Sequence, residues 1–167
     1  MEPLPITLAW SLLSPEAEPR VELFRWKQQA RTFFAAELEC VQTLSDPVLP
    51  NVAALELDVT HASDRDAVTR VRVITLPVAD CAEVLRAADA GVAAIGGAGF
   101  DHLVGKAKRV WQVDARLVNG SDARVPLVIA GVLASVLLSP IVPPDCITIF
   151  GVKGARVRLE KLHWPDR

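Results

Sequence analysis

The feature that most constrains the fold of this chain is the segment Val125–Val142, which contains no charged side chain. Its length approaches the ~18 residues that a bilayer-spanning helix needs. However, Pro126 and Pro140 leave an uninterrupted helical stretch of only about 13 residues, which suits a buried helix better. Proline is acceptable in the first turn of a helix. We therefore predict a buried helix over Pro126–Leu138 and no membrane partner.

A helix this uniformly apolar must be covered on nearly every side. Its small residues let it lie close to a sheet or to a symmetry mate; they are Ala130, Gly131, Ala134 and Ser135. Because the chain has only 167 residues, we expect part of this cover to come from a second copy. The sequence therefore predicts self-association into a homo-oligomer.

Composition predicts one folded domain over residues 1–167, since 51% of the residues are hydrophobic and the mean hydropathy is +0.29. Within it, residues 1–20 are interpreted as an N-terminal arm and residues 163–167 as a loose tail. Eighteen basic and twenty acidic side chains give a net charge of −2. Phosphate binding needs clustered Lys and Arg, so we expect no nucleic acid partner.

Three scattered cysteines, Cys40, Cys81 and Cys146, form no CxxC pair. This pattern argues against a disulfide framework and against a thiolate metal site, so no metal is predicted. The first residues lack the basic region of a signal peptide. We accordingly expect a cytoplasmic protein with free thiols.

Alternation of apolar and polar residues predicts strands in two neighbouring segments. Leu55–Val59 and Val68–Leu76 alternate with period two and are joined by a polar link, which predicts an antiparallel pair. Further strands are expected at Val110–Val118, which can equally continue the preceding helix as a strand, and at Ile147–Phe150 and Arg156–Leu162. Turns or loops are expected at Asp46–Pro50, Asn119–Gly120 and Pro143–Asp145.

Helical spacing predicts two further helices. One opens at Asp80, with Glu83 completing a capping box, and is interrupted at Gly91–Gly99. The other covers Phe100–Trp111, with a switch to strand near Trp111. Segment Val21–Leu44 fits a helix, although Ala36–Cys40 alternates like a strand, so both assignments stay open. The element order predicts an α+β layer sandwich, with a largely antiparallel sheet and helices packed on one face.

The strongest candidate site is the glycine run that precedes Phe100. Gly96, Gly97 and Gly99 leave main-chain amides unshielded where a helix begins, and such amides hold carboxylates or phosphates. His102 would then be a neutral base in the first turn, and Lys106 a charge partner one turn later. Asp101 would orient a polar group of the ligand. The alternative is structural: glycines permit close packing, and the polar residues form a solvated face.

Weaker candidates have equally plain structural interpretations. Arg124, in the loop 119–124, is a candidate anion ligand, or the loop caps the buried helix. Gly151–Gly154 resembles a GxxG loop but reads as a hairpin turn. His61 is interpreted as an interface residue for a second subunit. Two acidic pairs at strand spacing could place two carboxylates on one face and divide acid and base roles, but alternation with apolar residues explains each pair without a catalytic role. They are Glu37 with Glu39, and Glu56 with Asp58.

These observations lead to two functional hypotheses. The first is a homo-oligomeric protein that binds a small anionic metabolite at the glycine run and acts on it as a lyase, isomerase or transferase. Because no cofactor fingerprint is present, no cofactor is expected. The second is a non-catalytic binding or assembly protein.

Overall fold

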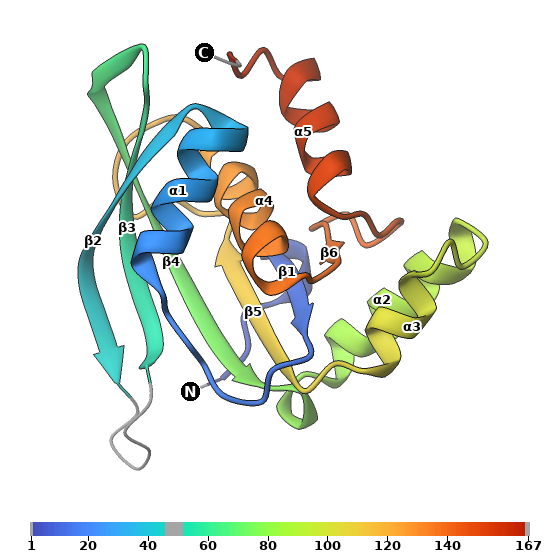
Figure 1. The fold of residues 1–167 in the computed structure, drawn as a ribbon. Helices are drawn as coiled ribbons and strands as arrows, with labels where there is room; N and C mark the ends of the chain where they lie inside the picture. The colour runs from blue at the N-terminus through green and yellow to red at the C-terminus, as the bar shows by residue number, and fades with distance from the viewer. Residues whose placement is uncertain (1, 46–51, 166–167) are drawn as a thin grey trace.

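The computed structural model describes residues 2–45 and 52–165. Within these ranges the strands form a six-stranded sheet in the order β2-β3-β4-β5-β1-β6, and every neighbouring pair is antiparallel (Figure 1). The predicted α+β class with an antiparallel sheet is confirmed. The strands are β1 (Ala9–Ser14), β2 (Ala36–Ser45), β3 (Val52–His61), β4 (Asp64–Pro77), β5 (Arg109–Asp114) and β6 (Ile141–Val142).

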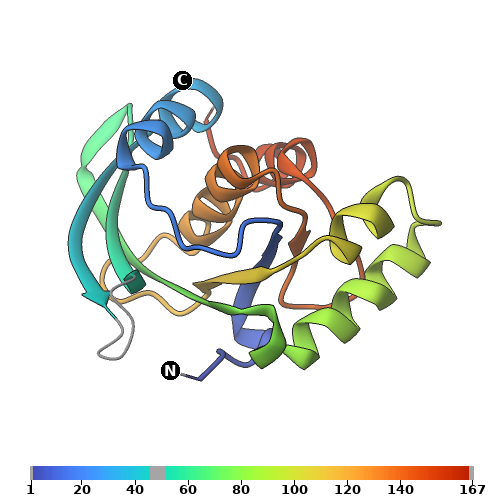
Figure 2. The same cartoon turned by 60° about the horizontal axis from the view of Figure 1, so that its bottom comes forward.

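Helices pack on both faces of this sheet, and more of them lie on one face than on the other. Figure 2 shows α1, α4 and α5 together on one side, while α2 and α3 lie next to the β6 end. Alternation along the strands separates the two packed layers: Trp111 faces the first group, and Val110 the second. The helices are α1 (Leu23–Phe34), α2 (Ala82–Ala94), α3 (Phe100–Gly105), α4 (Val125–Leu137) and α5 (Val152–Lys161), with 3-10 turns η1 (Ile6–Leu8) and η2 (Val78–Asp80).

The predicted apolar helix is α4, and residues 125–134 of it are all buried. Its cover comes from this same chain, because α4 packs between α1, α5 and the sheet. The small residues explain the close approach of α1: a Cβ at Gly131 would overlap the Phe34 ring, and the Ser135 hydroxyl lies 3.3 Å from Gln29 Oε1. Self-association therefore remains a prediction, and the apolar surface of α4 no longer supports it, because that surface is covered within one chain.

Segment 21–44 contains both alternatives that its pattern left open. Helix α1 ends at Phe34, Ala35 turns the chain in the left-handed region with φ of +48°, and β2 follows at once. The predicted antiparallel pair is also confirmed as β3 and β4, joined by a tight turn at residues 62–63. The predicted loop at Asp46–Pro50 lies outside the described residues.

Two helix predictions in the middle of the chain need correction. Helix α3 ends at Gly105, and Arg109 already begins β5, so residues 106–111 are not helical. The reason is tertiary: β5 hydrogen-bonds to both β1 and β4 in the centre of the sheet, which outweighs helical spacing. No capping box forms, since Asp80 belongs to η2 and α2 has no side-chain cap. Helix α2 also continues through Gly91 to Ala94.

The C-terminal strands were predicted wrongly. Val152–Lys161 is helix α5, whose buried residues Ala155 and Leu159 are four apart, as a helix face requires. Phe150 makes only an isolated bridge to Ile141. Gly151–Gly154 is therefore the start of a helix and no hairpin turn.

The described parts of both terminal segments pack into the fold. The segment assigned to an N-terminal arm contains β1, which lies between β5 and β6 inside the sheet. The segment assigned to a loose tail contains Trp164, which is only 6% exposed. Residues 166–167 of that segment lie outside the described residues.

Candidate functional site

The glycine run lies on the exposed surface between α2 and α3. Gly96, Gly97 and Gly99 all have φ between +74° and +88°, which only glycine adopts without strain. Two of the proposed anion-binding amides are already engaged: Gly96 N–H donates to Ala93 O at 3.3 Å and Gly97 N–H to Val92 O at 2.9 Å. The run therefore closes the end of α2, and the anion cradle predicted there stays an expectation.

The residues predicted to act beside this run are also at the surface. Asp101, His102 and Lys106 are exposed, and α3 is only six residues long. In the described part of the chain, none of the three side chains makes a hydrogen bond or an ion pair. Their proposed roles in catalysis remain predictions.

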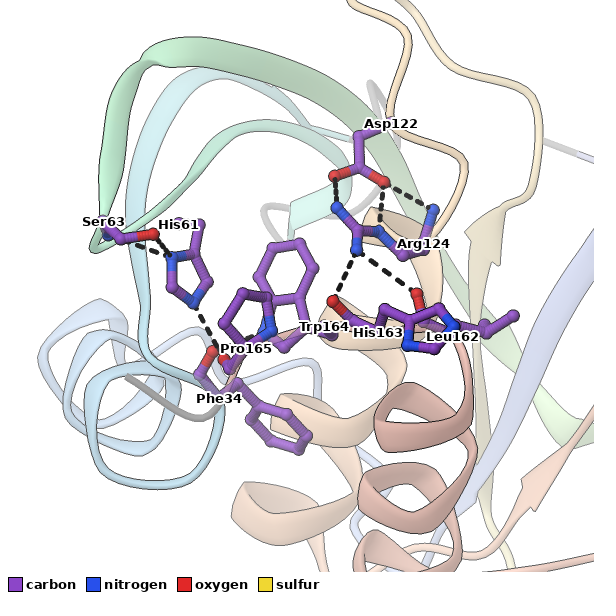
Figure 3. A network of polar contacts seen from close by, with 9 residues as sticks. All are labelled: Phe34, His61, Ser63, Asp122, Arg124, Leu162, His163, Trp164 and Pro165. Carbon is purple, nitrogen blue, oxygen red and sulfur yellow. Dashed lines mark hydrogen bonds and ion pairs between the residues drawn. The ribbon is translucent and has the colours of Figure 1, made fainter.

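Arg124, the remaining predicted ligand residue, makes several contacts within the protein (Figure 3). Its Nε and Nη2 donate to the two carboxylate oxygens of Asp122 at 2.9 and 2.8 Å. Its Nη1 donates to the main-chain oxygens of Leu162 and His163 at 3.3 and 3.0 Å. Four of the five guanidinium N–H groups thus have protein acceptors. Arg124 fastens the end of α5 to the start of α4.

His61 lies across from Arg124, at the end of β3. Its Nδ1 accepts a hydrogen bond from Ser63 N–H at 2.9 Å and lies 2.6 Å from Ser63 Oγ. Its Nε2 lies 2.8 Å from Pro165 O, which can only accept. The neutral tautomer with the proton on Nε2 satisfies all these contacts.

Trp164 connects these two groups. Its Nε1 donates to Phe34 O at 2.6 Å, its ring meets the His61 ring edge-on at 5.0 Å, and the Arg124 Cζ lies 5.1 Å from its centroid. Figure 3 shows Trp164 between His61 and Arg124, below the β3–β4 turn. The last described residues are therefore held by β3, by the loop before α4 and by the end of α1.

A cavity of about 150 Å³ lies among these residues, and we call it the Thr69 pocket. Thr69 points into the α4 side of the sheet, is only 3% exposed, and its hydroxyl has no hydrogen-bond partner in residues 2–45 and 52–165. Among the described side chains this hydroxyl is not one of the polar atoms sealed from solvent, so it is reached by solvent through the cavity. The pocket is lined by Val59, His61, Ser63, Asp64, Ala67, Thr69, Asp122, Arg124, Val125, Trp164 and Pro165.

The charge of the Thr69 pocket is weakly negative. Arg124 neutralises Asp122 and, through its hydrogen bonds, lowers the pKa of that carboxyl below its usual value. Asp64 also lines the pocket, is exposed and has no ion pair among the described residues. With His61 neutral, these three charged groups sum to −1, which disfavours an anionic ligand.

A second cavity, of about 220 Å³, lies between the N-terminal residues and the start of α2. Its lining includes Cys81, Asp80 and Glu83. Burial raises the pKa of the Cys81 thiol to about 11, so the reactive thiolate is scarce at neutral pH. The carboxylates of Asp80 and Glu83 in the lining oppose an anion there.

Within residues 2–45 and 52–165, no group of three or more His, Cys, Asp or Glu side chains is placed to hold a metal ion. In the same ranges, no helix combines the length and the apolar character that crossing a bilayer requires. Comparison of the chain with protein-family models, with curated proteins and with solved structures finds no match.

Sequence reasoning missed most of the Thr69 pocket. Arg124 was singled out, but His61 was interpreted as an intersubunit residue and Trp164 was placed in a loose tail. Thr69 gave no signal, because a threonine in an alternating strand is ordinary. A tryptophan near the end of the chain was the one usable clue, since such a large side chain is seldom left in water.

Proposed function

We propose that this protein binds a small, neutral or positively charged polar molecule in the Thr69 pocket. The observation that carries the proposal is the hydroxyl of Thr69, which borders a cavity, is reached by solvent there and has no hydrogen-bond partner in the described chain. A ligand that hydrogen-bonds this hydroxyl would take the place of water at the edge of a half-apolar cavity. Concave sites with an apolar floor and a few polar groups are where small molecules usually bind.

The size and charge of the pocket define the ligand class. A cavity of about 150 Å³ accommodates roughly six non-hydrogen atoms. Val59, Val125 and Trp164 supply apolar contact, and Asp64 supplies a carboxylate without an ion-pair partner in the described residues. Small amines and alcohols fit this description, because both carry a hydrogen-bond donor.

Binding is a better interpretation of this pocket than catalysis. A general base needs a free lone pair within reach of the substrate. In His61, Nδ1 accepts from Ser63 and Nε2 faces Pro165 O, so neither nitrogen is available without rearrangement. Arg124 is likewise engaged. The polar residues around Thr69 hold the pocket in shape.

Binding can be tested with ethanolamine, methylammonium and glycerol, followed by calorimetry and by chemical-shift mapping. The variant Thr69→Val keeps the shape and removes the hydroxyl. We expect it to weaken binding by about two- to tenfold, since one hydrogen bond is lost. We also expect its unfolding free energy to equal or exceed that of the wild type, because no internal hydrogen bond is broken.

Two further variants separate the alternatives. Asp64→Asn should weaken the binding of amines and leave that of glycerol unchanged. Lys106→Glu and His102→Gln should leave the affinity for all three molecules unchanged if the ligand occupies the Thr69 pocket. Loss of binding in these two variants, with Thr69→Val unaffected, would instead favour a small anionic metabolite at the glycine run, the other hypothesis raised by the sequence.

A further inference from the structure

Arg109, the first residue of β5, is a buried cation without an acidic partner. It is 9% exposed, and no carboxylate in residues 2–45 and 52–165 lies within 4 Å of its guanidinium. Buried charges in proteins are normally paired. By contrast, three more exposed arginines in this chain pair with aspartates; they are Arg70, Arg116 and Arg124.

The pKa values show the same contrast. Hydrogen bonds to aspartate raise the pKa of Arg70 and of Arg124, whereas burial lowers the pKa of Arg109. Among the described residues, the Cys81 thiol is the acidic group that acts on the pKa of Arg109. Since that thiol has a pKa of about 11, it is neutral at pH 7 and supplies no counter-charge.

The guanidinium of Arg109 is held in place by hydrogen bonds, but only some of its N–H groups have acceptors. Nε donates to Ala17 O at 2.7 Å, and Nη1 donates to Thr75 Oγ1 at 3.2 Å. Three of its five N–H groups therefore lack an acceptor in the described chain, both of those on Nη2 included. Among described residues the only side-chain nitrogen or oxygen that is both sealed from solvent and unpartnered is Trp26 Nε1. Nη2 of Arg109 is therefore reached by solvent.

We infer that Arg109 is the centre of a site for a small oxyanion, a phosphate or a carboxylate. Guanidinium binds such groups through two parallel N–H bonds, and Nη1 and Nη2 still offer such a pair. Fixing of the side chain by Ala17 and Thr75 reduces the entropy that binding would otherwise lose. The anion supplies the counter-charge that this part of the chain lacks.

The exposed charges around Arg109 offset one another. Lys108 directly precedes Arg109, Lys106 lies three residues before it, and both are exposed. Two exposed carboxylates, Glu16 and Glu18, flank Ala17 and offset the two lysines, and the exposed Asp80 lies near Cys81, so the charge that favours an anion is that of Arg109 itself. This site is separate from the Thr69 pocket, because β5 begins at the opposite end of the sheet from the β3–β4 turn (Figure 1).

The test compares inorganic phosphate and acetate with chloride at equal ionic strength, by calorimetry and by thermal unfolding. Wild type should bind phosphate or acetate saturably. Arg109→Met, which keeps the length and removes the charge, should bind at least about tenfold more weakly. Arg109→Lys retains the charge but lacks the two parallel N–H donors of a guanidinium. Its affinity should lie between those of the wild type and Arg109→Met. Arg116→Met, which removes a paired surface arginine, is the matched control and should bind like the wild type.

The results can also overturn the inference. Unchanged binding in Arg109→Met would do so, as would the absence of saturable binding by wild type. Arg109→Met should unfold no more easily than wild type without phosphate, because an uncompensated buried cation is removed. If Arg109 instead pairs with a carboxylate of a second copy, sedimentation will show that the wild type self-associates. This self-association will be lost in Arg109→Met, and added phosphate will not restore it.

Discussion

The indole Nε1 of Trp164 donates a hydrogen bond of 2.6 Å to the main-chain oxygen of Phe34. This bond joins the chain's C-terminal segment to the last turn of α1. Phe34 O is one of the carbonyls that a helix end leaves without an internal partner, so Trp164 satisfies a group that burial would otherwise penalise. It also places the Trp164 ring over the Thr69 pocket, which makes this contact part of the proposed site as well as of the fold.

Replacement of Trp164 by Phe should therefore destabilise the protein. The variant loses the hydrogen bond to Phe34 O and part of the packing between His61 and Arg124. We expect urea denaturation to show a loss of about 2–4 kcal/mol. Trp10→Phe is the control, since the Trp10 side chain is half-buried and its nitrogen makes no hydrogen bond in the described chain; a loss below about 1.5 kcal/mol is expected there. Equal losses in the two variants would contradict an anchoring role for Trp164.

Gly131 should not tolerate a methyl group. Alanine is the better helix former by about 1 kcal/mol, but a Cβ at Gly131 overlaps the buried Phe34 ring. Overpacking of a core costs about 1–3 kcal/mol, so we expect Gly131→Ala to lower the free energy of unfolding. Gly105→Ala is the matched control, because a Cβ there meets nothing within 4 Å. It should be neutral or slightly stabilising in the same denaturation assay.

Acid should weaken the contact between Asp122 and Arg124. The pKa of Asp122 is lowered below the value of 3.8 that it has when unfolded, chiefly by the Arg124 hydrogen bonds. The carboxylate therefore contributes stability above about pH 4, and this contribution disappears as the pH falls through the folded-state pKa. Stability curves between pH 2 and 6 should be flatter for Asp122→Asn than for wild type. The same change at the exposed Asp89 serves as the comparison, and an equal flattening there would refute the assignment.

Cys81 should be inert towards thiol reagents at neutral pH. It is 2% exposed and burial raises its pKa to about 11 from 9.0. Half-buried Cys40 should be labelled by a disulfide reagent in the native state, whereas Cys81 should be labelled only on unfolding. Because the folded pKa is raised, the protein should lose stability as the pH rises from about 9 towards 11. That loss should be smaller in Cys81→Ala; fast native labelling of Cys81 would speak against its burial.

Local sequence determined the elements whose pattern is strong over a short span. The uncharged run between Pro126 and Pro140 defined α4, because so apolar a helix has to be buried. Alternation through Leu57 and Val71 defined the β3–β4 pair, because a sheet with one packed face requires period two. Gly120 was recognised as a turn residue, and its φ of +87° is the local reason; the tertiary reason is that a Cβ would lie 2.7 Å from Val68 O.

Tertiary structure decided the elements whose local pattern fits two conformations. Residues 106–111 have helical spacing, yet hydrogen bonding of β5 to β1 and β4 makes residues 109–111 a strand. Residues 156–162 alternate like a strand, yet packing on α4 makes most of them a helix. The Thr69 pocket and the surroundings of Arg109 were beyond sequence reasoning for a related reason. Each combines side chains from segments far apart in the chain, and only the folded sheet determines which of those segments become neighbours.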